Sequence, residues 1–191
     1  MRSLLSAYSR ASIAAPLSTA FATCLAKGSA SDAIAQVQVE KAEKIDWKRN
    51  FAFAFFSGAY LGIGQHYVYN VAFGRIFGNG QDVMTALKKC VADSTVHVPM
   101  IYLPLYYPFK TVMLGEGTAL DGLNRYTKHD ALPEFMGGGG VLTTYWSMWP
   151  AFHFVNFKFT PPELRIGLVA GVSFLWLIYL SYASHKEEPS R

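Results

Sequence analysis

This sequence has few charged residues for its length, and several of its long segments have none. Only 16% of the residues are Asp, Glu, Lys or Arg, whereas 51% are hydrophobic. An ordinary soluble domain has about 25% charged residues. The composition therefore excludes a typical soluble domain and predicts an integral membrane protein.

The sequence also lacks the short motifs of common catalytic sites. It contains no G-x-S-x-G, no H-E-x-x-H, no Walker lysine after its four consecutive glycines, and no Cys/His set with zinc spacing. We therefore expect no enzyme activity, no cofactor, and no catalytic, cofactor-binding or metal residue. A metal site built across helices from His66, Asp93 and His97 is the less favoured alternative.

Cysteine is scarce as well, with Cys24 and Cys90 alone in the chain. Both stand in apolar surroundings, which favours buried free thiols over a disulfide.

Positive charge is present, but it is not concentrated. The net charge is +4, and each basic cluster has acidic residues beside it, as in residues 40–44. A nucleic-acid-binding surface needs a continuous basic patch. We therefore expect membrane lipids as partners, and no nucleic acid.

The N-terminal segment lacks acidic residues. It carries Arg2, Arg10 and Lys27 among many serines, and no acid precedes Asp32. Such a composition resembles a mitochondrial transit peptide. We interpret it as the beginning of a first helix that also carries targeting information.

Apolar segments of about the length of a bilayer crossing predict the fold. We expect a single transmembrane domain over residues 1–191, all-α, in which four transmembrane helices form a compact bundle. An additional interfacial or partly inserted apolar helix is expected before the last span. The predicted spans are 12–38, 51–73, 89–109 and 166–183, the extra apolar segment is 135–157, and the main polar loop, with a short interfacial helix, is 111–134.

Two local features refine this bundle. Pro99, Pro104 and Pro108 interrupt the third span, so we expect a kinked helix there. Two pairs of glycines at a spacing of four residues, Gly58 with Gly62 and Gly167 with Gly171, predict close packing between helices.

The first three spans and the apolar segment 135–157 each carry a polar pair at helical spacing. Polar groups at membrane depth must face a partner or water, because an unpaired charge there is costly. The pairs therefore either bridge helices, the favoured interpretation, or line a hydrated pore, and both stay open. The candidate residues are Asp32, Gln36, His66, Asn70, Asp93, His97, His153 and Asn156.

A polar joint, residues 156–165, separates the last two apolar segments and is expected at a water interface. Pro161 and Pro162 end one helix, and aromatic and basic side chains are expected to anchor the flanking helices among lipid headgroups. The predicted interface anchors are Trp146, Trp149, Arg165 and Trp176.

The residues around this joint resemble a known family, named for the Mpv-seventeen protein and the twenty-two-kilodalton peroxisomal membrane protein. The specific matches are residues 145–150, Asn156 with Phe157, Pro161, Arg165, Trp176, and Leu180 with Ser181. Weaker matches along the earlier helices are Tyr8, Pro16, Asp32 with Gln36, Arg49, Gly58, Gly62, His66, Tyr69, Lys89, Asp93 and Pro99. The chain departs from the family at Ser94 and His153, where Gln is usual, and at Val68, where Trp is common.

The resemblance implies a four-span protein with both termini on one side of the mitochondrial inner membrane or the peroxisomal membrane. It also implies a poorly selective channel or metabolite pore in organelle homeostasis, and it provides no catalytic residue. We expect the mitochondrial inner membrane, with the peroxisomal membrane as the alternative. The competing function is a non-catalytic accessory subunit of a large mitochondrial membrane complex, such as the respiratory chain or ATP synthase. Its partners would be the other subunits or further copies of the chain.

Overall fold

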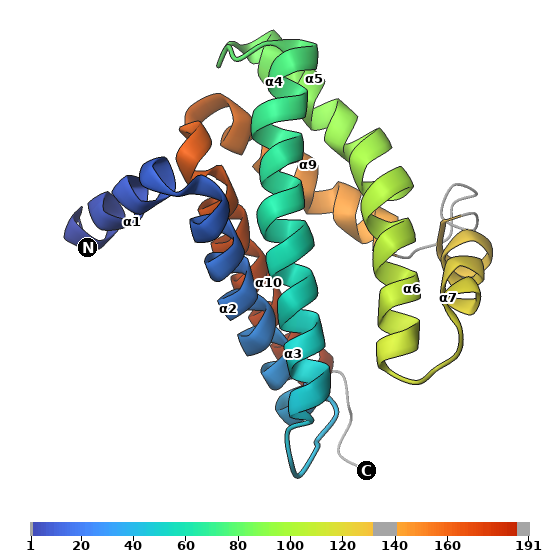
Figure 1. Ribbon diagram of the computed structural model, residues 1–191. Coiled ribbons are helices and arrows are strands. Elements are labelled where there is room, and N and C mark those ends of the chain that lie inside the picture. The colour runs from blue at the N-terminus through green and yellow to red at the C-terminus, as the bar shows by residue number, and fades with distance from the viewer. Residues whose placement is uncertain (1, 132–140, 187–191) are drawn as a thin grey trace. The chain divides into compact units, whose positions relative to one another are not determined.

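The computed structural model describes residues 2–131 and 141–186, and Figure 1 shows its helices. These residues form helices and connecting turns, with no strand among them, as the predicted all-α class requires. The contacts within the chain divide it into two compact units, residues 1–72 with 161–191 and residues 73–160. The single transmembrane domain stays a prediction.

The first unit contains the two ends of the chain. Asp46 begins the helix that starts at Trp47, because its side chain accepts a hydrogen bond from the backbone N–H of Arg49 at 3.0 Å. Its helical elements are α1 (Arg2–Ala14), α2 (Pro16–Ile34), the π-helical η1 (Ala35–Val39), α3 (Trp47–Phe56), the π-helical η2 (Ser57–Gly64) and η3 (Tyr67–Ala72), the 3₁₀ turn η6 (Pro162–Leu164) and α10 (Arg165–Lys186).

Helix α2 is the centre of this unit, since α3, η2 and α10 all pack against it. Glycines make the approach to η2 close. A Cβ atom added at Gly62 would lie 2.7 Å from the carbonyl oxygen of Ala20, and one at Gly58 would lie 2.9 Å from the ring of Phe21. The first pair of glycines therefore packs between helices as predicted.

The second pair of glycines behaves differently. Gly167 faces the ring of Tyr8, whereas a Cβ atom at Gly171 would meet no atom of the described part of the chain within 4 Å. The expectation that both glycines of this pair pack against a helix is wrong for Gly171, because no described segment covers that face of α10.

The second unit contains the long third helical segment and the helix before the joint. Asp82 and Thr118 begin two of its helices as side-chain caps. Its elements are α4 (Phe73–Phe77), α5 (Val83–Ala92), the π-helical η4 (Asp93–Tyr102), α6 (Leu103–Met113), α7 (Ala119–Arg125), the π-helical η5 (Tyr126–Ala131) and α9 (Val141–Phe159). Helix α5 packs against α9, and α6 packs against α7.

Prolines shape this unit without ending its long helix. Pro99 lies inside η4, where hydrogen bonds skip one more residue than in an α-helix, and the N–H of Leu103 bonds to Val98. The next residue, Pro104, has no N–H to offer the carbonyl of Pro99. The hydroxyl of Tyr126 donates to that carbonyl instead, at 2.6 Å. The expected kinked segment is thus stabilised by a side chain from η5.

The observed helices differ from the predicted ranges at several ends. Residues 12–38 are divided by a bend at Ala15, because Pro16 suits the first position of a helix. The predicted polar loop 111–134 includes the end of α6, α7 and η5, and residues 132–134 lie outside the described residues, as do the first residues of the apolar segment 135–157. Over the described parts of the chain, no helix is both long enough and apolar enough to cross a membrane.

Candidate functional site

A buried carboxylate is the centre of the strongest polar site. Asp93 stands where α5 passes into η4, and its side chain has an exposed fraction of 0%. Nδ1 of His97, one helical turn later, is hydrogen-bonded to Oδ1 of Asp93 at 2.7 Å. Across the interface, the hydroxyl of Tyr145 on α9 donates to Oδ2. Nε2 of His153, also on α9, lies 3.6 Å from the same oxygen. We name these four residues the Asp93 cluster.

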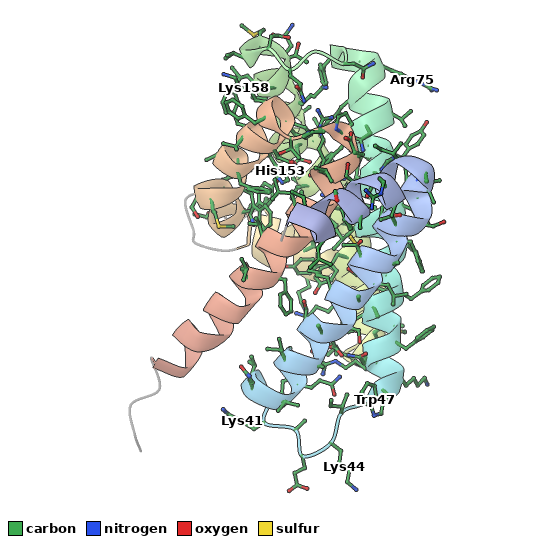
Figure 2. All side chains as sticks on the ribbon, turned by 90° about the vertical axis from the view of Figure 1, so that its left-hand side faces the viewer. Lys41, Lys44, Trp47, Arg75, His153 and Lys158 are labelled. Atoms are coloured by element: carbon green, nitrogen blue, oxygen red, sulfur yellow. The ribbon has the colours of Figure 1, made fainter. Side chains whose placement is uncertain are left out.

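A column of stacked rings lines the α9 side of this cluster. Tyr145, Trp149, His153 and Phe157 follow one another at intervals of four residues, so they share one face of the helix. Their ring centroids are 6.1, 5.5 and 5.9 Å apart, and successive rings are tilted by no more than 27°. The column holds the Tyr145 hydroxyl and the His153 imidazole in fixed positions beside Asp93. Figure 2 labels His153 within the packed side chains.

Two further hydrogen bonds connect the same helices. The indole N–H of Trp146 donates to the carbonyl of Ser94 at 3.0 Å, and the thiol of Cys90 donates to the carbonyl of Pro150 at 3.1 Å. Both cysteines are free and buried, as expected. The Asp93 cluster is therefore enclosed between polar contacts on both sides along α5 and η4.

Asn156 lies on α9, three residues beyond His153. Its side chain is fully buried, and neither its amide nitrogen nor its amide oxygen has a hydrogen-bond partner among the residues that the structure describes. Buried polar atoms almost always have a partner, in the protein or in ordered water. Asn156 is therefore an exception to this rule at the buried side of α9.

The pair Asp32 and Gln36 forms a second network, at the end of α2. Asp32 accepts hydrogen bonds from Gln36 at 2.7 Å, from Arg49 at 3.1 Å and from Asn50 at 3.2 Å. Arg49 also makes two 2.7 Å bonds to Glu40. Asp32 lies on α2 and its donors come from η1 and α3, so this carboxylate connects α2 with α3.

The pair His66 and Asn70 connects to the joint. The amide of Asn70 lies 3.2 Å from Nδ1 of His66 and donates to the carbonyl of Pro162 at 3.1 Å. Its oxygen accepts a bond of 3.2 Å from Arg165. Pro162 and Arg165 of the joint are thus bonded to Asn70 on η3, and all three residues belong to the first unit.

The predicted interface anchors occupy different surroundings. Trp146 and Trp149 are half-buried; Trp146 donates to the carbonyl of Ser94, and Trp149 stacks on Tyr145 and His153. Arg165 is buried, with an exposed fraction of 3%, and bonds to Asn70. The side chain of Trp176 lies outside the described side chains. A role in headgroup anchoring stays a prediction for all four.

The structure thus brings Asp93, His97 and His153 together, and it keeps Asp32 with Gln36 and His66 with Asn70 in separate networks. Sequence reasoning assigned no bonding role to Tyr145, Arg49 or Asn50. Their signal in the sequence was a carboxylate inside an apolar segment, because a buried carboxylate requires donors from neighbouring helices. The cluster combines a carboxylate acceptor with a hydroxyl donor and two imidazoles. Within the described ranges no group of three or more His, Cys, Asp or Glu residues is arranged to hold a metal ion.

Comparison with known proteins agrees with the resemblance read from the sequence. The model of the Mpv17 / PMP22 family matches residues 139–181. Protein SYM1 of Candida albicans is 30% identical over 109 residues, which are 56% of this chain and 52% of the relative, so the match spans about half of that protein. PXMP2/4 family protein 3 of Dictyostelium discoideum is 27% identical over 172 residues, covering 90% of this chain and 86% of the relative.

A third relative is the peroxisomal membrane protein PMP22 of Arabidopsis thaliana, which is 25% identical over 87% of this chain and 82% of its own length. No solved structure matches. These relatives agree with the predicted location, the mitochondrial inner membrane or, alternatively, the peroxisomal membrane, which the Arabidopsis relative carries in its name.

Proposed function

We propose, from the premise that this chain belongs to the Mpv17/PMP22 family, that it is a small membrane protein forming a poorly selective pore at the Asp93 cluster. The observation that carries the proposal is the burial of the Asp93 carboxylate against two histidines and a tyrosine. An ionisable group inside an apolar segment is costly, and such groups commonly mark ion or proton pathways.

Insertion in a membrane is part of this proposal, and the described surface supports it. Large apolar side chains are exposed on the outside of α3, including Phe51 and Phe55. Lys41, Lys44 and Trp47 lie at the end of the first unit where α2 and α3 are connected (Figure 2). An apolar flank that ends in basic and aromatic residues is the pattern of a bundle surrounded by lipid.

Under this proposal, the arrangement described here corresponds to a closed form of the pore. Asp93 is fully buried, and the contacts of Cys90, Asp93 and Ser94 hold α5 and η4 against α9. Conduction would require water to enter between these helices, beside a carboxylate that favours cations. Asn156, buried without a partner among the described residues, offers a polar group at the same interface.

The alternative function, a non-catalytic accessory subunit, is supported by a different observation. Asp32, Gln36 and Asn70 make bonds that connect helices or fasten the joint. Such bonds stabilise a bundle and need no pore. Under this alternative the Asp93 cluster also serves only to connect α5 and η4 with α9.

Recording from planar bilayers that contain the purified chain separates the two functions. We expect ion currents in the unmodified protein, and in Asp93→Asn a changed conductance or a reduced preference for cations, with the protein still folded. Asp32→Asn is the matched control, because it also neutralises a buried helical carboxylate, and it should lower stability without changing ion preference. Absence of current at every voltage would overturn the pore and favour the subunit. Imaging of a tagged chain against mitochondrial and peroxisomal markers tests the proposed mitochondrial location.

A further inference from the structure

The first helix, α1, is held at a defined angle to α2. Ala15 leaves the helical conformation, with φ of −143°, and Pro16 begins α2. The hydroxyl of Thr19 spans the bend and donates to the carbonyl of Ala11 at 3.1 Å. Figure 1 shows that α1 and the beginning of α2 meet at this bend and that the two helices point in different directions. The bend is therefore built into the chain by hydrogen bonds on both sides of the proline.

One face of α1 is packed against the first unit. The Tyr8 hydroxyl lies 3.2 Å from the hydroxyl of Thr23 on α2, and either can donate. The same ring covers Gly167 on α10 so closely that a Cβ atom there would lie 2.5 Å from the Tyr8 oxygen. Ser12, one turn after Tyr8, is buried, and the joint element η6 also contacts α1.

The same face continues past the packed part of the helix. Leu4 and Leu5 precede Tyr8 by four and three residues, so they extend its face by one turn. Their side chains are nevertheless 76% and 61% exposed. The helix thus presents two leucines that no described segment of the chain covers.

The opposite face of α1 carries polar and basic side chains, together with the exposed Ile13. Ser6 and Arg10 are four residues apart, and each is two residues from Tyr8, which places them on the far side of the helix from its ring. Arg10 is exposed, and α1 contains no acidic residue. The charge of this face is therefore suited to an anionic surface.

We propose that α1 lies in the membrane interface, with Leu4 and Leu5 in the outer acyl region and Arg10 directed to anionic lipid headgroups. This inference rests on the proposed membrane insertion. A basic amphipathic helix binds in the plane of the interface through its apolar side and through attraction to anionic lipids. Two exposed leucines are too small a patch for a stable protein interface, which buries about 800 Å² on each partner. A lipid surface needs no such area.

Spin labels on the full chain, reconstituted in phosphatidylcholine vesicles with or without phosphatidylglycerol, test this placement. Single cysteines would replace Leu4, Ser6 and Phe55 in turn, in a background of Cys24→Ser and Cys90→Ser. Collisions with oxygen report the acyl region, and collisions with a water-soluble nickel chelate report water. We expect the oxygen-to-nickel ratio at position 4 to exceed that at position 6 by at least about threefold. Position 55, on α3, is the reference for membrane insertion.

The other possible results distinguish a failure of this inference from a failure of membrane insertion. If position 4 meets the nickel chelate as freely as position 6 while position 55 meets oxygen, α1 does not touch lipid and the inference fails, although the proposed function stands. If position 55 also meets the chelate, membrane insertion itself fails. If position 4 is shielded from both reagents, protein covers it, which also overturns the inference. Phosphatidylglycerol should raise the ratio at position 4, and Arg10→Glu should abolish that rise; no effect of this lipid would overturn the headgroup contact.

Discussion

The close contact between α2 and η2 allows a quantitative test with two glycines. At Gly62, an added methyl group would lie 2.7 Å from the carbonyl oxygen of Ala20 and 2.9 Å from Cα of Phe21. These are backbone atoms, so the helices must move apart as a whole. Overpacking of this kind costs about 1–3 kcal/mol, and the higher helix propensity of alanine returns about 1 kcal/mol. We therefore expect Gly62→Ala to lower the free energy of unfolding by up to about 2 kcal/mol.

Gly171→Ala is the matched control, because it is the same substitution in a helix of the same unit. No atom of the described residues lies within 4 Å of its added methyl group, so only the gain in helix propensity remains. This variant should equal or exceed the original stability by up to about 1 kcal/mol. Unfolding of both variants in mixed micelles of mild and denaturing detergent, followed by circular dichroism, measures the difference. Equal stability of the two variants would refute the tight α2–η2 contact.

Three further predictions concern hydrogen bonds. Tyr126→Phe leaves the carbonyl of Pro99 without its 2.6 Å donor, so the free energy of unfolding in the same micelles should fall by about 1–3 kcal/mol; no loss would mean that another donor reaches this carbonyl. Asp32→Ala removes the acceptor of three hydrogen bonds and should cost about 2–3 kcal/mol. Glu40→Gln, at a partly exposed partner of Arg49, should cost less than about 1 kcal/mol; equal losses would contradict the different burial of the two carboxylates. The hydrogen bond from the Thr118 side chain lowers the pKa of Asp121, as the bond from Thr85 lowers the pKa of Asp82. Because the pKa of each carboxyl is lower in the folded protein, its contribution to folding stability is complete above the usual carboxyl pKa and is lost as the pH falls below about 4. Thermal unfolding of the original chain and of Asp121→Asn from neutral to acidic pH should therefore converge at low pH, and a constant difference would contradict it.

Much of the helical organisation could be predicted from local sequence. The cap at Asp46 marks the beginning of α3, and Pro16 marks the beginning of α2. These signals are readable because capping side chains and prolines act on the backbone within one turn. The packing of Gly58 and Gly62 was also predictable, but Gly171 has the same spacing and packs against nothing described. Spacing places glycines on one face of a helix, and only the fold decides whether another helix lies there.

The candidate site likewise has features that the sequence predicts and features that only the fold provides. From the amino-acid sequence alone follow the helical class, the ionisable residues Asp32, His66, Asp93 and His153 inside apolar segments, and the resemblance to the Mpv17/PMP22 family. Tertiary structure alone decided the partners: Asp93 meets Tyr145 from a helix 52 residues away in the chain, and Asn70 meets Arg165 at the joint. Hydrophobic periodicity reports which face of a helix is buried. It carries no information on which residues of a distant helix cover that face, because the partners of a buried polar group depend on the register and angle at which two helices pack.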